Sequence, residues 1–329
     1  MKKFVALFLG LSSVLFAETT YDSFGFQEMY PTKAGSVEWN SAHWANGKAR
    51  QVEWDGDSDD PLDWTESHSA GDGSFDIDGK GVMQMNWNDG PRFHINSLRG
   101  SQTQFFLNVE FTGYFMRNAL GGKDYGGMIV GLRSGPLGHA SSGGDDCDAT
   151  TYYARFRNDG KWDFEKEWKH PESYYCTTSG VGNQDPLWNG DVLPVGKWIG
   201  MKYVARNKDA STVRLELWID STSNATPPGK WEFVGAVEDA GIDFRGASSE
   251  AISGCSYTDA YAPILKGGGT VLMRSDNDHP YYQFVTIREI DPNASSTFPE
   301  AIQKMPKKFQ MKSSAKSFDL LGRCASPLR

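Results

Sequence analysis

Short stretches of alternating apolar and polar residues recur along the chain, separated by Gly, Asn, Asp and Pro. A period of two places successive side chains on opposite faces of a β-strand, whereas a helix needs a period of 3.6. No long amphipathic helical pattern precedes residue 300. The number and spacing of these stretches predict an all-β fold, a two-sheet antiparallel sandwich. The expected strands are residues 81–87, 105–117, 126–133, 151–157, 161–168, 198–206, 213–220, 232–238, 270–274 and 282–290.

The stretch from residue 35 to residue 79 is rich in Trp, Asp, Ser and Gly and is expected to be a long loop. Loops of that length in a compact domain are usually functional. Within it, "WDGDSDDPLDW" brings Asp55, Asp57 and Asp59 close together. Alternating carboxylates can surround a hard cation, so the loop is a candidate structural Ca²⁺ site, although it does not match the EF-hand pattern. The alternative is a solvated acidic loop.

The two ends of the chain differ from its middle. The opening "MKKFVALFLGLSSVLFA" has two lysines, an apolar run and small residues, which predicts a signal peptide over residues 1–17. The run is short for a membrane span, and no later segment is apolar for long enough to be a transmembrane helix. We therefore expect a protein that is secreted or displayed on the cell surface, with one domain over residues 18–295 and a basic linker and tail over 296–329.

The body of the chain is acidic, because residues 18–300 hold 24 basic and 41 acidic side chains, a net charge of −17. Such a body repels phosphate backbones, which argues against nucleic acid as a partner. Aromatic residues make up 13% of the chain. Aromatic rings beside acids and amides suit polysaccharide binding, although β-sheet cores are also rich in aromatic residues.

Two of the four cysteines, Cys147 and Cys176, flank one expected hairpin and are predicted to form a disulfide in an exported protein. The cysteine spacing does not resemble a zinc site.

The stretch "KWDFEKEWKH" carries Asp163, Glu165 and Glu167 on one face of an expected strand. Two turns could connect it to the preceding strand. The three-residue loop Asn-Asp-Gly sets Arg155 opposite Asp163 and Tyr153 opposite Glu165. This register is favoured over a two-residue turn because it pairs charge with opposite charge and apolar with apolar residues.

Two interpretations of this acid row stay open at this point. It is either a solvated outer strand face with ion pairs of little value, or one wall of a polar cleft. His170 directly follows the strand, and Trp162 and Trp168 lie within or beside it as candidate substrate-binding residues.

The chain resembles the concanavalin A-like jelly-roll group, which includes glucanases, polysaccharide lyases and lectin-like modules. The resemblance is carried by an expected first strand at "YDSF", middle strands in "KWIGMKYVARN" and "VRLELWID", and a last strand in "YYQFVTIREID". It covers about residues 20–292 and implies a jelly-roll fold with a polysaccharide as partner.

For the retaining glucanases of this group, the resemblance implies a nucleophile at Asp163 and an acid/base at Glu167, with Glu165 between them. Here the Asp comes first and a Glu is central, which departs from the order of residue types in that family. Retaining chemistry also needs carboxyl groups about 5 Å apart.

For the lyases of the group, the resemblance implies Tyr or His as base and acid, here Tyr153 and His170. Basic and polar groups hold the uronate carboxylate and stabilise the enolate, a role that Arg155, Arg133 and His139 could take.

The string "SFDLLGR", residues 317–323, resembles C-terminal sorting segments of secreted proteins of Bacteroidetes and Fibrobacter type. The resemblance implies contact with a secretion machinery, and a disordered tail is the alternative.

Two further patterns are interpreted as structural. "PRFHIN" places Arg92, His94 and Asn96 on one face of a strand, where a satisfied structural histidine is the commoner outcome. "SDNDHPYY" indicates a hairpin turn. The sequence thus supports a polysaccharide-degrading enzyme, hydrolase or lyase. A non-catalytic carbohydrate-binding surface protein and a purely structural surface protein are the alternatives.

Overall fold

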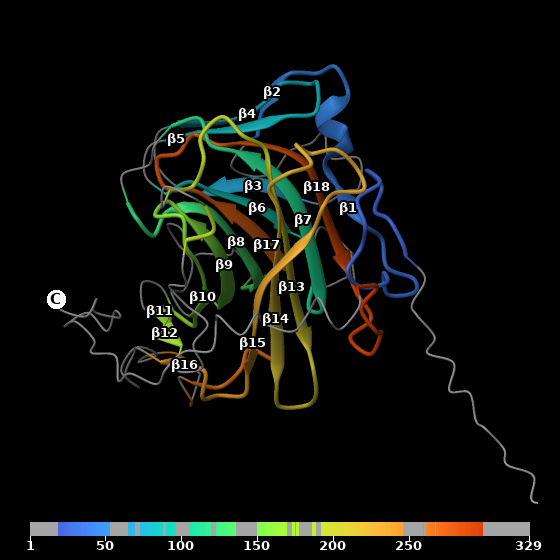
Figure 1. Cartoon of the computed structure of the whole chain (residues 1–329), viewed down its shortest axis with the longest axis vertical. Helices are drawn as coiled ribbons and strands as arrows, with labels where there is room; N and C mark the ends of the chain where they lie inside the picture. Colours follow the sequence, from blue (N-terminus) through green and yellow to red (C-terminus); the bar gives the residue numbers. More distant parts are fainter. Residues whose placement is uncertain are drawn as a thin grey trace, which may run out of the picture.

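The computed structural model shows an all-β protein built from two antiparallel sheets (Figure 1). It describes residues 19–52, 65–69, 73–87, 90–96, 106–119, 123–135, 150–169, 173–174, 176–177, 186–188, 192–245, 255, 259, 261–266 and 268–298. Its elements are β1 (Trp39–Asn40), the 3₁₀ helix η1 (Ser41–Ala45), β2 (Arg50–Gln51), β3 (Thr65–Ser69), β4 (Gly73–Ile77), β5 (Met83–Trp87), β6 (Arg92–Asn96), β7 (Val109–Met116), β8 (Gly127–Ser134), β9 (Thr151–Arg157), β10 (Trp162–Glu167), β11 (Ser173–Tyr174), β12 (Cys176–Thr177), β13 (Ile199–Asn207), β14 (Val213–Asp220), β15 (Glu232–Asp239), β16 (Phe244–Arg245), β17 (Thr270–Arg274) and β18 (Tyr281–Glu289).

Each sheet mixes strands from distant parts of the chain. The nine-stranded sheet has the order β15-β14-β13-β7-β18-β5-β4-β2, with β1 also paired to β18. The seven-stranded sheet has the order β11-β10-β9-β8-β17-β6-β3, and β12 pairs with β16 separately. The expected two-sheet sandwich of jelly-roll type is confirmed. Among the described residues, no helix has the length and apolar character needed to cross a membrane.

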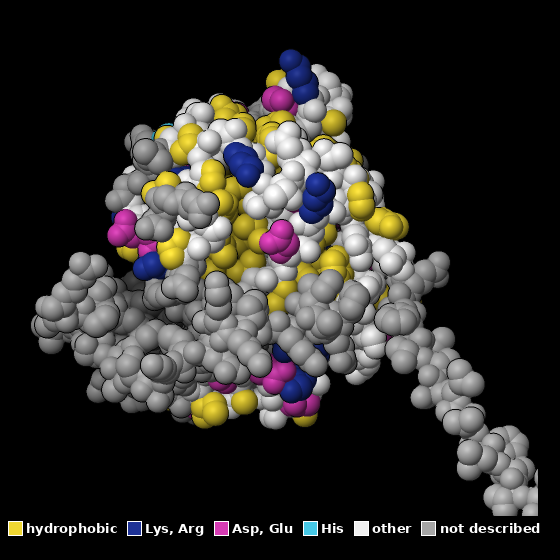
Figure 2. Space-filling model, in the orientation of Figure 1, with side chains coloured by type: hydrophobic (Ala, Val, Ile, Leu, Met, Phe, Trp, Pro, Cys, Tyr) yellow, Lys and Arg dark blue, Asp and Glu magenta, His cyan; other side chains and the backbone are white. Residues whose placement is uncertain are grey.

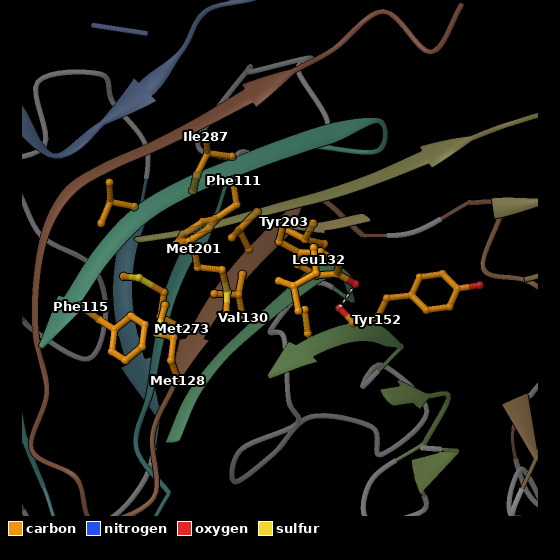
Figure 3. Packing of buried hydrophobic residues seen from close by; sticks show 14 of the residues in the cluster. Phe111, Phe115, Met128, Val130, Leu132, Tyr152, Met201, Tyr203, Met273 and Ile287 are labelled. Carbon is orange, nitrogen blue, oxygen red and sulfur yellow. Dashed lines mark hydrogen bonds between the residues drawn. The ribbon is translucent and has the colours of Figure 1, made fainter. Parts of the chain in front are cut away.

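The core lies between the two sheets, where alternate residues of the longer strands point inward (Figure 3). Phe111 and Met201 of the nine-stranded sheet meet Val130 and Met273 of the seven-stranded sheet in this layer. The alternation that predicted the strands therefore also decides which side chains are buried in the core.

The ten expected strands are all present, with ends shifted by a few residues. Two expectations are wrong. The stretch 35–79 is not one structureless loop, because it contains β1, η1, β2, β3 and β4. The expected first strand at "YDSF" is a tight turn: Asp22 Oδ1 accepts hydrogen bonds from the backbone N–H groups of Phe24 and Phe26, and an isolated bridge joins Tyr21 to Gln27.

The residues after this turn cover the outer face of the nine-stranded sheet. Phe26, Met29 and Tyr30 pack there against Tyr114 and Trp218, in a second apolar cluster separate from the main core. This sheet is therefore buried on both faces.

Candidate functional site

The outer face of the seven-stranded sheet carries a set of charged and aromatic side chains, which we call the polar face. It comprises Arg92 and His94 of β6, Arg274 of β17, Tyr153 and Arg155 of β9, and Asp163, Glu165 and Glu167 of β10. Apart from Lys166, the residues that lie between them on the same strands belong to the core cluster, so these side chains point away from the core.

The strand register arranges the polar face in rows. One row runs Asp163, Arg155, Ile129, Arg274 and Arg92 across β10, β9, β8, β17 and β6. The next row begins at Glu165 and Tyr153 and continues through Gly131 and Leu272 to His94. Acids thus line one side of the face, basic groups line the other, and a less polar strip lies between them.

The β9–β10 hairpin adopts the register expected from the sequence. Arg155 pairs with Asp163, Tyr153 pairs with Glu165, and Gly160 closes the loop with a φ of 77°. Only glycine adopts this left-handed conformation readily, which explains why the last residue of the loop "NDG" is a glycine.

The acid row is buried and is not a solvated strand face. Asp163 is 0% exposed, Glu165 8% and Glu167 2%. Arg155 donates from Nε and Nη2 to the two carboxylate oxygens of Asp163, at 2.5 and 2.8 Å. Its Nη1 lies 2.6 Å from Glu165 Oε2. The ion pairs here are therefore desolvated, unlike exposed pairs.

Asp163 is held as a carboxylate by its neighbours. Burial by itself would raise its pKa, but the charges and hydrogen bonds of Arg155 and Arg157 outweigh burial and lower the pKa. Arg157 Nη1 also donates to Asp163 Oδ2, at 3.0 Å. Because both oxygens are engaged by guanidinium groups, Asp163 is poorly placed to attack a sugar carbon.

Tyr153 lies on β9, directly beside the acid row of β10, and is 1% exposed. Its hydroxyl donates a hydrogen bond to Glu167 Oε2, at 3.1 Å. A Cβ at Gly131 would lie 3.0 Å from Tyr153 Cε1 and 2.8 Å from Leu272 Cγ, so the glycine makes room for these side chains. Burial first, and then the charge of Glu167, raise the pKa of Tyr153 well above its ordinary value.

Two arginines stand directly opposite each other on β6 and β17, Arg92 and Arg274. Like charges in this position are unfavourable. Burial and the charge of Arg274 lower the pKa of Arg92, while Tyr153 and Glu167 act in the opposite direction. Asp276 accepts from Arg274 Nη2 at 3.2 Å, but Arg274 Nε is buried without a hydrogen-bond partner among the described residues. With its side chain 21% exposed, Arg274 is also where solvent reaches the face.

The remaining predicted site residues lie elsewhere. Trp162 and Trp168 pack in the core cluster. Arg133 is fully buried, and it donates to the carbonyl groups of Leu107 and Ile264. These placements leave none of the three side chains on the polar face.

Several predictions lie outside the described residues: His139, His170, the Ca²⁺ loop with Asp55, Asp57 and Asp59, the side chains of Cys147 and Cys176, the signal peptide over 1–17 and the tail after residue 298. They stay predictions. Within the described part of the chain, no three His, Cys, Asp or Glu side chains are grouped so that they could hold a metal ion.

The sequence interpretation missed the basic side of the polar face. Arg92 and His94 were placed on one strand face but were interpreted as structural, and Arg274 was not singled out. The spacing in "RFHIN" and "TVLMR" gives the faces of these strands. What it lacks is the pairing of β6 with β17, two strands about 180 residues apart, which brings the arginines together.

On the side of the molecule shown in Figure 2, acidic and basic side chains of the described residues are interspersed, and several lie next to each other at the lower edge of the view.

No family model matches the chain, and no curated protein sequence matches it either. Solved structures do. A protein of unknown function from Shewanella oneidensis MR-1 is 10% identical over 90% of this chain and 99% of its own, with a TM-score of 0.32. The alginate lyase Aly36B is 11% identical over 74% of this chain and 97% of its own, with a TM-score of 0.32. The carbohydrate recognition domain of Emp46p is 9% identical over 70% of this chain and 90% of its own, with a TM-score of 0.34. At these scores the likenesses carry no functional argument, which must come from the polar face itself.

Proposed function

We propose that this protein is a secreted polysaccharide-active enzyme, and that it is a lyase which cleaves a uronate-containing polysaccharide by β-elimination on the polar face. The observation that carries the proposal is the position of Tyr153 between the acid row and the opposed pair Arg92 and Arg274. A tyrosine that can exchange a proton beside paired cations is what removal of a proton next to a carboxylate requires.

The roles follow from the charges. Arg92 and Arg274 would bind the uronate carboxylate and stabilise the negative charge that develops on it as the proton leaves. Asp276 already offsets part of their mutual repulsion through its ion pair with Arg274, and a bound uronate carboxylate would offset more of it. His94, in the same row as Tyr153 and three strands away, would bind the neighbouring sugar. At about 4.8 Å per strand, the two backbones are roughly 14 Å apart, a span that suits more than one sugar unit.

The hydrolase hypothesis receives less support from the same geometry. A retaining hydrolase needs a carboxylate free to act as nucleophile. Asp163 is engaged by two arginines, and Glu165 is paired with Arg155.

The test is a panel of neutral and uronate polysaccharides, read by reducing ends and by absorbance near 235 nm from unsaturated uronates. We expect both signals on a uronate polymer with the wild type. Tyr153→Phe should abolish both. The matched control is Tyr203→Phe, since Tyr203 is also a fully buried tyrosine with one hydrogen bond, from its hydroxyl to the Tyr152 carbonyl oxygen, at 3.2 Å.

The panel separates the alternatives. Reducing ends without absorbance, lost in Glu165→Gln, would make the protein a hydrolase. If neither reducing ends nor absorbance appears, and the protein still binds one polymer, it would be a non-catalytic carbohydrate-binding protein.

Export, the Ca²⁺ loop, the Cys147–Cys176 disulfide and the sorting tail belong to this proposal as expectations from the sequence. The first three have direct tests: the N-terminus of the exported protein, the effect of EDTA on the melting temperature, and mass spectrometry of the cysteines. An unchanged melting temperature or free thiols at both cysteines would remove the corresponding feature.

A further inference from the structure

The hydrogen bond between Tyr153 and Glu167 joins two side chains that are almost completely buried, 1% and 2% exposed. The tyrosine hydroxyl is the donor, so the bond exists with the proton on Tyr153. Burial and the charge of Glu167 raise the pKa of Tyr153, which keeps the hydroxyl protonated at neutral pH.

A protonated tyrosine cannot act as a base by itself. It can remove a proton from the substrate only if its own proton leaves at the same time. The acceptor that the structure gives to the Tyr153 hydroxyl is Glu167 Oε2, at 3.1 Å and inside the range for proton transfer.

We propose that Glu167 takes the phenolic proton of Tyr153 while the Tyr153 oxygen removes the substrate proton, so that the two residues act as a proton relay. This inference rests on the proposed lyase function and adds a specific role for Glu167. Glu167 acts through Tyr153 and needs no contact with the substrate.

The proton and electron balance is complete. The Tyr153 oxygen takes the proton from the carbon beside the carboxylate, and the electron pair of that bond becomes the new carbon–carbon double bond. The bond to the glycosidic oxygen breaks with its electron pair. That oxygen receives the proton that Tyr153 removed, and Glu167 then returns the phenolic proton to Tyr153. No oxidant, reductant or further reactant is needed.

Charged groups on β6, β9, β10 and β17 bear on this pair, whereas β8 contributes only Ile129 and Gly131 to this face. Glu165 lies on the same strand as Glu167 and forms an ion pair with Arg155 of β9, which also pairs with Asp163. Arg92 on β6 and Arg274 on β17 supply positive charge that acts on Tyr153, and His94 ends the row that Tyr153 shares. The arginines therefore limit the cost of negative charge on the tyrosine oxygen during the relay.

The molecule contains a matched control on its other sheet. Tyr30 donates to Glu216 Oε1 at 2.7 Å, and both residues are buried. As with Tyr153, burial first and then the charge of its glutamate raise the pKa of Tyr30. The pair lies on the outer face of the nine-stranded sheet, away from the polar face.

The first experiment measures kcat and its pH profile on the cleaved polymer by absorbance near 235 nm. We expect Glu167→Gln to lower kcat by about 100-fold or more. This variant should also lose the fall in kcat at low pH that protonation of Glu167 causes in the wild type. Glu167→Asp should restore part of the rate and should show this fall again. Glu216→Gln should leave both unchanged. A Glu167→Gln enzyme with the wild-type rate and profile would overturn the relay while leaving the lyase function standing.

The second experiment needs no substrate. In protein labelled with ¹³C at the tyrosine ring, the Tyr153 signal is assigned by its loss in Tyr153→Phe and titrated with base. We expect Tyr153 to ionise at lower pH in Glu167→Gln than in the wild type, because the carboxylate charge that opposes ionisation is gone. An unchanged titration would overturn the coupling. If the wild type forms no unsaturated product on any polymer, the lyase function and the relay in catalysis both fail, and this titration still decides whether the two side chains are coupled.

Discussion

The outer faces of the two sheets both carry buried charge, yet the charges are used differently. On the nine-stranded sheet, Glu110 accepts hydrogen bonds from the backbone N–H groups of Met29 and Tyr30. It also forms an ion pair with Arg288. Arg288 in turn donates to the Tyr30 carbonyl oxygen, at 3.0 Å. These charges fasten the N-terminal segment to the sheet through its backbone.

On the seven-stranded sheet, the described contacts of the buried charges run mainly between side chains. Arg155 joins Asp163 and Glu165, Tyr153 joins Glu167, and Arg274 stands opposite another arginine. Charges that hold backbone have a structural explanation.

The nine-stranded sheet also has two directly opposed arginines, Arg206 and Arg214, but both form ion pairs with Glu216, at 3.9 and 2.6 Å. On the polar face, Arg274 pairs with Asp276 at one side of the sheet, while the acids of β10 line the other side. This separation of acids from opposed arginines across one sheet face makes it the candidate site.

The largest expected effect is the loss of stability when Glu110 of the nine-stranded sheet is removed. Glu110→Ala removes the acceptor of two buried backbone N–H groups and a counter-ion of the buried cations Arg288 and Lys202, of which Arg288 keeps Glu28. Removal of one member of a buried ion pair costs about 3–5 kcal/mol of the free energy of unfolding. Urea unfolding should show this loss. For comparison, Lys208→Ala removes a half-exposed pair with Glu238 and should cost less than about 1 kcal/mol. Equal losses would contradict the structural role of Glu110.

The next effect concerns Asp163 and depends on pH. Its folded-state pKa is lowered, so its ion pairs stabilise the fold above the unfolded-state pKa, and this contribution is lost as pH falls through the folded-state value. Asp163→Asn should therefore cost about 3 kcal/mol at pH 7 and progressively less below pH 4. Denaturant unfolding of both proteins from pH 7 to pH 2.5 measures the difference. A cost that stays constant over this range would show that the carboxylate charge is not what stabilises the hairpin.

A third prediction concerns the space that Gly131 leaves beside Tyr153. Gly131→Ala would place a methyl group 2.7 Å from Thr151 Cγ2 and 2.8 Å from Leu272 Cγ, so side chains on the polar face must shift. We expect a stability loss of about 1–3 kcal/mol, together with a clear loss of kcat because Tyr153 is displaced. Full activity despite the stability loss would mean that the position of Tyr153 over β8 is unimportant.

The smallest stability effects come from the two matched tyrosines. Tyr153→Phe and Tyr30→Phe each remove one hydrogen bond to a buried glutamate and should each cost about 1 kcal/mol. Thermal unfolding should barely distinguish them. Only Tyr153→Phe should lose activity, and a comparable activity loss in Tyr30→Phe would contradict the assignment of the site to one sheet.

Local pattern predicted much of this molecule. The alternation in "KWDFEKEW" and the turn chemistry of "NDG" gave the correct hairpin register, including Arg155 opposite Asp163. Both signals act between neighbours in the sequence. They could not predict that the acid row is buried, because burial depends on the whole fold.

The basic side of the polar face could not be predicted from local sequence patterns either, because it also depends on the whole fold. Arg92 and Arg274 meet only because β6 pairs with β17, and no turn or spacing in the sequence specifies that pairing. The short strands between residues 39 and 77 were missed because Gly, Asp and Ser dominate that stretch. Their partners in the sheets, and not their own composition, make them strands.

The rate of unsaturated uronate formation decides whether the chemistry takes place on the polar face. It is measured for the wild type and for Tyr153→Phe, with Tyr203→Phe beside them at matched folded fraction. We predict product from the wild type and from Tyr203→Phe and none from Tyr153→Phe. Product formation by Tyr153→Phe at the wild-type rate would contradict this prediction and would move the chemistry away from the polar face.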